Sequence, residues 1–86
     1  MQIVFSQNGW TDFTYWLEND RKLVIKVAKL ISAIRRDPYT GIGKPERLKH
    51  DLSGYWSRRI NQEHRIVYEV NERAETCTII SCRHHY

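Results

Sequence analysis

The sequence of residues 21–36 is Arg21-Lys22-Leu23-Val24-Ile25-Lys26-Val27-Ala28-Lys29-Leu30-Ile31-Ser32-Ala33-Ile34-Arg35-Arg36. Its apolar residues recur at helical spacing and form one continuous stripe, which consists of Leu23, Val24, Val27, Leu30, Ile31 and Ile34. Apolar residues at positions i, i+3, i+4 and i+7 predict an amphipathic helix with one buried face. This stretch therefore predicts a fold in which a long helix packs its stripe against a second layer.

Both ends of this helix are marked in the sequence. Asp20 is a good N-cap, because its carboxylate can accept a hydrogen bond from the first turn. Asp37-Pro38 ends the helix, since a residue that precedes proline avoids the α region. Upstream, a shorter helix is predicted with Ser6 or Asn8 as its cap. The expected apolar face of this shorter helix consists of Trp10, Phe13, Thr14 and Leu17.

The remaining segments predict β structure. Residues 2–5 alternate and are apolar enough for a short first strand, and residues 55–60, 64–70 and 76–82 predict three more. The predicted order is therefore β-α-α-β-β-β. We expect an α+β fold in which an antiparallel twisted sheet carries both N-terminal helices on one face. Eighty-six residues leave no room for a second core, so a single domain over 1–86 is expected.

The sequence contains no sign of a membrane segment. No stretch approaches the roughly 20 apolar residues that a membrane helix needs. The first five residues lack the basic flank and long apolar segment of a signal peptide. We therefore expect a cytoplasmic protein without a membrane partner.

The positive charge is concentrated in one part of the chain. The net charge is +4, and residues 35–65 contain eight of the 14 Lys and Arg but four of the 10 Asp and Glu. The other residues contain six of each sign. Local positive charge of this kind is expected of a protein that meets phosphates, although a solvated basic face kept for solubility would look the same.

Two arginines flank the turn Asn61-Gln62-Glu63. If this turn is a three-residue loop, Arg59 pairs with Arg65, and both side chains lie on one face of the sheet. A two-residue loop would separate them. We favour the three-residue loop, because it also places Ile60, Ile66, Tyr68 and Val70 toward the helices. Two neighbouring guanidiniums repel each other unless an anion lies between them, and phosphate fits their geometry. A solvated outer face is the alternative.

Glu46 and the residues after the last strand could supply acid–base chemistry. Glu46 lies in a predicted loop among cations, which favour the ionised carboxylate that can accept a proton, although an exposed salt-bridged glutamate would have the same neighbours. His84 and His85 carry imidazoles, which exchange protons near neutral pH. Tyr86 offers a ring that can stack on a base.

Together these residue types suit RNA cleavage without a metal ion. Glu46 could accept the proton of a ribose 2′-OH, and His85 could protonate the departing 5′ oxygen. Arg59 and Arg65, together with Lys49, could stabilise the charged phosphate. The sequence has no cluster of carboxylates for Mg²⁺, so we expect no cofactor.

The two cysteines do not predict a disulfide. Cys77 and Cys82 are five residues apart in a predicted strand, so their side chains should point to opposite faces and their Cα atoms should lie about 16 Å apart. A zinc site formed by Cys82, His84 and His85 is conceivable, but the paired spacing of metal ligands is missing.

Three runs of sequence resemble the YoeB/Txe family of toxins, within the RelE superfamily. They are Gly43-Lys44-Pro45-Glu46-Arg47-Leu48-Lys49-His50-Asp51-Leu52-Ser53-Gly54-Tyr55-Trp56-Ser57-Arg58-Arg59-Ile60, then Glu63-His64-Arg65-Ile66-Val67-Tyr68, and Cys82-Arg83-His84-His85-Tyr86. The likeness covers essentially the whole chain. It implies a microbial-ribonuclease-like fold and a bacterial toxin of a type II toxin–antitoxin pair that cleaves mRNA in the A site of the ribosome. It also implies a YefM-like antitoxin and often a homodimer.

The resemblance also assigns roles to residues. The family's base, charge-stabilising arginine and general acid match Glu46, Arg65 and His85. Its supporting positions match Lys49, Arg59 and Tyr86. The family has an aromatic residue where this chain has His84, which leaves open which imidazole donates the proton.

Two other functions remain compatible with the sequence. A small protein that binds RNA or the ribosome and blocks translation without cutting would need the arginines but not Glu46 or His85. A structural module whose C-terminal residues face only an antitoxin would need neither RNA binding nor RNA cleavage.

Overall fold

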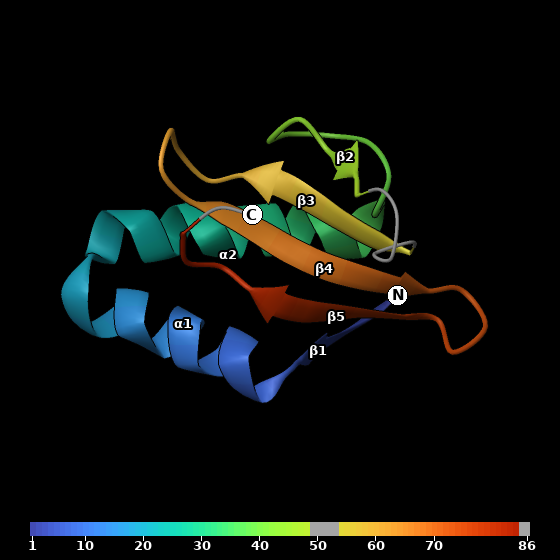
Figure 1. The fold of residues 1–86 in the computed structure, drawn as a ribbon, viewed down its shortest axis with the longest axis horizontal. Helices are drawn as coiled ribbons and strands as arrows, with labels where there is room; N and C mark the ends of the chain where they lie inside the picture. The colour runs from blue at the N-terminus through green and yellow to red at the C-terminus, as the bar shows by residue number, and fades with distance from the viewer. Residues whose placement is uncertain (49–53, 85–86) are drawn as a thin grey trace.

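The computed structural model describes residues 1–48 and 54–84 of the chain. Two helices and four strands follow one another in the predicted order, and a fifth, short strand is added at Glu46 (Figure 1). The elements are β1 (Gln2–Phe5), α1 (Gln7–Asn19), α2 (Arg21–Arg36), β2 (Glu46–Arg47), β3 (Tyr55–Arg59), β4 (Arg65–Asn71) and β5 (Thr76–Ser81). The α+β class is thus confirmed, and Glu46 belongs to a strand where a loop was expected.

The five strands form one sheet in the order β1-β5-β4-β3-β2. The pairs among β2, β3, β4 and β5 are antiparallel, as predicted, whereas β1 runs parallel to β5 and makes the sheet mixed. No hairpin turn links β1 to β5, because they lie at opposite ends of the chain. Alternation of side chains therefore gave no information about the direction of this pair.

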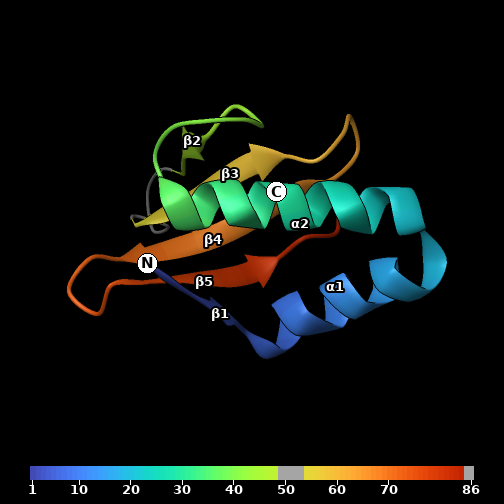
Figure 2. The same ribbon diagram turned by 180° about the vertical axis from the view of Figure 1, so that it is seen from behind.

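Both helices cover the same face of the sheet, as predicted. Seen from behind, α2 crosses in front of β3 and β4, and α1 lies on the side of β1 and β5 (Figure 2). The predicted stripe of α2 faces the core. None of the described helices is long and apolar enough to cross a membrane. The core cluster consists of Trp16, Val24, Val27, Leu30, Ile34, Ile60, Ile66, Tyr68, Cys77, Ile79 and Cys82.

The buried face of α1 differs from the prediction. Trp10 and Leu17 are 53% and 49% exposed, and the buried residues of the helix are Gly9, Asp12 and Trp16. A Cβ at Gly9 would lie 2.1 Å from the carbonyl oxygen of Ile79, so the helix approaches β5 where only glycine fits. Apolar periodicity could not anticipate this rotation, because a glycine and a carboxylate define the contact face.

A bulge also changes the direction of one cysteine. The pairing of β4 with β5 shifts between Val67 and Tyr68, so that β5 contributes an extra residue, Ile80. The alternation of side chains restarts there, and Cys77 and Cys82 both face the core instead of opposite faces. Both are free thiols. Burial raises the pKa of Cys82 to about 12, which keeps the thiol protonated.

Arg58, one of the eight cations counted in residues 35–65, is fully buried. Its Nε donates to the Tyr68 hydroxyl at 3.1 Å, and that hydroxyl donates to the Pro38 carbonyl at 2.7 Å. Burial raises the pKa of Tyr68, so the phenol stays a donor. The other guanidinium nitrogens donate to three carbonyls of the loop 37–43, those of Asp37 at 2.7 Å, Thr40 at 2.9 Å and Ile42 at 3.1 Å.

The same loop is braced from its outer side by Asp37. Its carboxylate accepts hydrogen bonds from the backbone N–H of Tyr39 at 2.9 Å and the hydroxyl of Thr40 at 2.8 Å. These bonds lower the pKa of Asp37. The loop that leads into β2 is therefore held by a buried cation on one side and a surface carboxylate on the other.

We expect the substitution Arg58→Met to destabilise the protein by about 3 kcal/mol, because several buried acceptors would lose their donor at once. The adjacent Arg59→Met is the matched control. Arg59 is exposed, so this change should alter the free energy of unfolding by less than about 0.5 kcal/mol. Urea denaturation of both variants measures the difference. Equal stabilities would show that Arg58 does not hold the loop.

Candidate active site

Strands β2, β3 and β4 bring polar side chains together on the face of the sheet opposite the helices. Arg59 pairs with Arg65 across the hairpin, and the N–H of Ile60 donates to the His64 carbonyl at 2.9 Å. The three-residue loop is therefore confirmed, together with the shared face of the two arginines. On β2, Glu46 pairs with Ser57 of β3.

Arg65 is the centre of this group. Its Nη1 lies 3.7 Å from the Glu46 Oε1 and donates to the Ser57 hydroxyl at 3.1 Å. The side chain of Arg65 is 23% exposed and that of Glu46 is 56% exposed. The carboxylate is thus open to solvent beside a partly buried, oriented guanidinium. No role was predicted for Ser57, although a β2–β3 pairing would have placed it opposite Glu46.

A close approach of the chain positions β2 at this face. The carbonyl of Gly43 accepts a hydrogen bond from the N–H of Arg59 at 2.7 Å. Gly43 has φ +86°, and a Cβ there would lie 2.8 Å from a methyl carbon of Leu30. Only glycine fits both the backbone conformation and the space. Lys44, with φ 52°, then redirects the chain toward β2.

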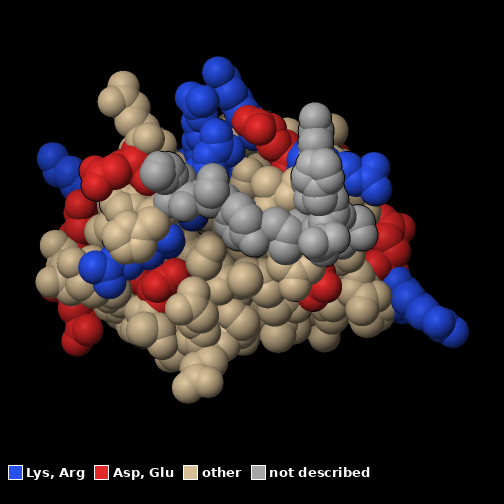
Figure 3. Space-filling view, in the orientation of Figure 1, with Lys and Arg blue, Asp and Glu red and all other residues tan. Residues whose placement is uncertain are grey.

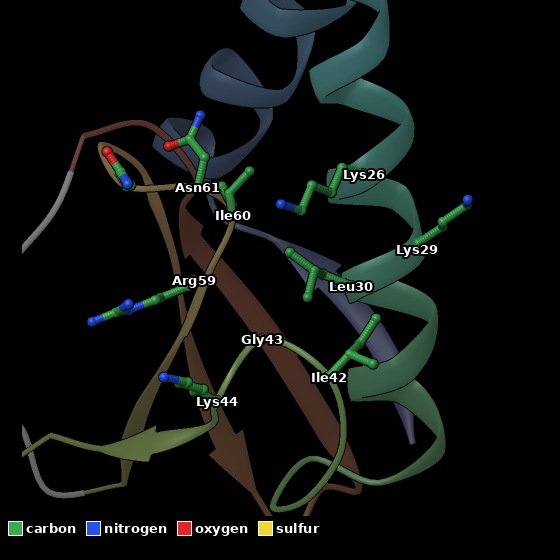
Figure 4. Close-up of a pocket in the computed structure, with 10 residues that line it drawn as sticks. Lys26, Lys29, Leu30, Ile42, Gly43, Lys44, Arg59, Ile60 and Asn61 are labelled. Carbon is green, nitrogen blue, oxygen red and sulfur yellow. The ribbon is translucent and has the colours of Figure 1, made fainter.

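A separate cavity of about 650 Å³ lies on the other side of β3, between α2 and the loop that contains Gly43. Its floor is apolar and includes Leu30, Ile42 and Ile60. In Figure 4, Lys26 reaches toward Ile60, whereas Arg59 points away from α2. Arg59 thus lines the edge of this cavity, and its side chain points away from the apolar floor.

The exposed cations near β2 and β3 form part of a basic surface. In Figure 3, the largest group of Lys and Arg on this face lies along the upper edge, the side on which Figure 1 shows β2 and β3. Arg58 does not contribute to this surface, because it is buried. The charge available to a phosphate is thus smaller than the sequence count suggested.

The residues after β5 are held by four hydrogen bonds, two to α1 and two to the residues at the start of β4. The N–H of Cys82 donates to the Asp12 carboxylate at 3.1 Å, and the indole N–H of Trp16 donates to the Cys82 carbonyl at 2.7 Å. The N–H of His84 donates to His64 Nδ1 at 2.7 Å, and the N–H of Arg65 donates to the His84 carbonyl at 2.8 Å. The backbone of His84 therefore lies beside that of Arg65.

Three predicted site residues, Lys49, His85 and Tyr86, lie outside the described residues. The strand β5 ends at Ser81, one residue before the end of the predicted strand 76–82. Among residues 1–48 and 54–84, no three His, Cys, Asp or Glu side chains gather closely enough to hold a metal ion.

This chain is similar to known toxins over its whole length. The family model described as the YoeB-like toxin of the bacterial type II toxin–antitoxin system matches residues 5–86. The protein named Toxin YoeB from Synechocystis sp. is 55% identical over 86 residues, which cover all of this chain and 98% of that protein.

Solved structures agree with this similarity. A YoeB/ParE toxin from Agrobacterium tumefaciens is 44% identical with a TM-score of 0.94, and each chain is fully covered. A YoeB dimer from Staphylococcus aureus is 46% identical with a TM-score of 0.89. A heterotetrameric YoeB–YefM toxin–antitoxin complex from the same organism is 46% identical with a TM-score of 0.87. The match covers all of this chain and 98% of each Staphylococcus aureus chain.

We expect the substitution Glu46→Gln to change the free energy of unfolding by less than about 0.5 kcal/mol. The Glu46 side chain is mostly exposed, and its ion pair with Arg65 is long. Chemical denaturation of the variant and the parent protein checks this. A loss of several kcal/mol would mean that Glu46 is there to support the fold.

Proposed function

This chain belongs to the YoeB-like toxin family of bacterial type II toxin–antitoxin systems, and on this premise we propose that it is a ribosome-dependent endoribonuclease that cleaves mRNA in the A site. The strongest structural support is the exposed carboxylate of Glu46 beside the oriented guanidinium of Arg65. A base and a phosphate-binding cation at this spacing suit attack on a phosphodiester by its neighbouring ribose hydroxyl.

In the proposed reaction Glu46 removes the proton from the 2′-OH of the nucleotide before the scissile bond. The 2′ oxygen then attacks phosphorus, and the bond from phosphorus to the 5′ oxygen breaks. His85 gives its proton to that departing oxygen. The products are an RNA with a 2′,3′-cyclic phosphate and an RNA with a free 5′-OH, so the atoms balance without a metal ion or a water molecule. The cyclic phosphate can later open to a 3′-phosphate.

Arg65 is suited to hold the phosphate during this reaction. One of its nitrogens already contacts Ser57 and Glu46. A guanidinium has five N–H donors, so other donors remain for phosphate oxygens. The hydrogen bond to Ser57 orients the group before the substrate binds, which avoids reorganisation during the reaction. Arg59, its cross-strand neighbour, adds a second positive charge on the same face.

The openness of the site explains why the ribosome would be needed. More than half of the Glu46 side chain is exposed, so the described residues leave the base open to solvent. Orientation of the substrate must then come from elsewhere, and we propose that ribosomal RNA supplies it. Lys49, Arg59 and Tyr86 are proposed to contact RNA. Phosphate contacts release counterions, so binding should weaken steeply with added salt. Such an activity belongs in the cytoplasm, where ribosomes translate.

We expect both Glu46→Gln and His85→Ala to lose at least about 100-fold in the rate of mRNA cleavage on purified ribosomes, because each removes one proton-transfer group. Both variants should still bind ribosomes. Mapping the 5′ ends of a reporter mRNA measures cleavage, and sedimentation measures binding. The matched control is Glu69→Gln, which removes the same charge from β4 without a proposed role.

The same experiment separates cutting from binding. If the protein only blocks the ribosome, the parent protein and the variants Glu46→Gln and His85→Ala would all halt translation equally well. No new 5′ ends would then appear. That result would favour the non-cutting alternative. New ends that carry 5′-phosphates instead of 5′-OH groups would contradict attack by the 2′-OH.

The proposed protein partner is a YefM-like antitoxin. The Staphylococcus aureus YoeB of the heterotetrameric complex is bound to YefM and is similar to this chain over its whole length. An antitoxin that covers the face with Glu46 and Arg65 would block the RNA substrate. We propose that neutralisation occurs in this way.

We also propose that the protein forms a homodimer, as its relative from Staphylococcus aureus does. An exposed aromatic cluster suits this contact. Trp10 stacks on Phe13 with ring centroids 5.8 Å apart and meets the edge of Phe5 at 5.4 Å. Leu17 follows Trp10 by seven residues on α1 and is 49% exposed. Apolar side chains exposed together often mark a contact surface.

We expect Trp10→Arg to lower the dimer fraction at least about tenfold, because a charge at the centre of an apolar contact costs desolvation energy. Analytical ultracentrifugation measures the dimer fraction. The matched control is Ile25→Arg, since Ile25 is equally exposed at 50% but lies on α2. If both variants dimerise like the parent, the aromatic cluster is not the contact.

A further inference from the structure

His64 is the one polar residue of the β3–β4 turn whose side chain is buried, with 8% of its surface exposed. Its ring packs edge-on against Trp16, with centroids 4.7 Å apart. The Asn61 side chain accepts hydrogen bonds from the N–H of Glu63 at 2.8 Å and of His64 at 2.7 Å, which fixes the turn. The ring is thus held in one place by α1 and by its own turn.

The Nδ1 atom of this ring accepts a hydrogen bond from the backbone N–H of His84 at 2.7 Å. On the other side of the same residue, the His84 carbonyl accepts from the N–H of Arg65 at 2.8 Å. The chain at His84 is therefore held by two consecutive residues of the hairpin. An acceptor at Nδ1 requires a neutral ring with its proton on Nε2.

The conformation of His84 indicates that these bonds act against strain. His84 has φ 67°, in the left-handed region that residues with a side chain seldom adopt. Such a conformation persists only where surrounding contacts fix it. The His84 side chain is exposed, and its ring lies against the ring of His64 with centroids 5.7 Å apart. The hydrogen bonds that fix this conformation are made by its backbone. The bond to His64 Nδ1 is one of the two.

We propose that His64 is a positioning residue for the proposed cleavage reaction. Its Nδ1 lone pair holds the backbone of His84, the residue before His85, beside the backbone of Arg65. The proposal rests on the proposed function, in which His85 donates a proton. The ring of His64 packs against the rings of Trp16 and His84 and accepts a hydrogen bond from the His84 backbone, so it acts on His85 only through the chain.

The matched variants are His64→Asn and His64→Leu. The amide oxygen of an asparagine can take the place of Nδ1 and accept the same hydrogen bond, whereas leucine fills the space beside Trp16 without an acceptor. A residue that only fills the core would tolerate leucine better than asparagine. A residue that anchors the chain through an acceptor would show the opposite order.

The experiment measures two quantities on each variant. Amide hydrogen exchange by NMR follows the N–H of His84, and mRNA cleavage on ribosomes gives kcat and KM separately. For His64→Leu we expect exchange of the His84 amide at least about tenfold faster, and kcat at least about tenfold lower with KM unchanged. For His64→Asn we expect both values within about threefold of the parent protein.

Three outcomes decide the matter. Unchanged protection of the His84 amide in His64→Leu would overturn the proposal, and so would an asparagine variant as impaired as the leucine variant. If exchange follows the expected order but neither the parent nor any variant cleaves mRNA, the anchor stands and the proposed function fails. Should His64→Leu not fold, His64→Gln replaces it with the same expectations, because glutamine places its amide near the Nε2 position.

Discussion

The buried guanidinium of Arg58 is the constraint on which the arrangement of the site depends. A charge in the core is tolerated only when its donors are satisfied, and here the loop 37–43 and the Tyr68 hydroxyl satisfy them. That loop delivers the chain to β2 and thereby brings Glu46 to the sheet. On the same strand, Ser57 points to the opposite face and contacts Arg65. Two consecutive residues of β3, Arg58 and Ser57, thus support the loop on one face and build the site on the other.

A second set of buried polar groups fixes the other side of the site. Asp12 and Trp16 of α1 hold the backbone at Cys82, and His64 of the hairpin holds it at His84. Both sets meet at β4, where Arg65 lies between the chain from β2 and the chain that follows β5. The apolar core provides the two layers, and the buried polar contacts decide which residues meet on the outer face.

Much of this could be predicted from the sequence. The spacing of apolar residues identified α2, and the length of one turn placed Arg59 opposite Arg65. The parallel pairing of β1 with β5 could not be predicted, because no turn joins them. Arg58 was counted among the cations of residues 35–65, and its burial could not be predicted because its partners are three backbone carbonyls and the Tyr68 hydroxyl. The prediction of the buried face of α1 was wrong, because Gly9 and the carboxylate of Asp12 lie on that face.

The central claim is that the face with Glu46 and Arg65 cuts RNA through the 2′-OH that neighbours the scissile phosphate. The most direct measurement uses ribosomes programmed with an mRNA in which one A-site nucleotide is 2′-deoxy. The account predicts that cleavage after that nucleotide disappears while the protein still binds the ribosome and cuts the unmodified message. Cleavage at the 2′-deoxy position at the normal rate would contradict it.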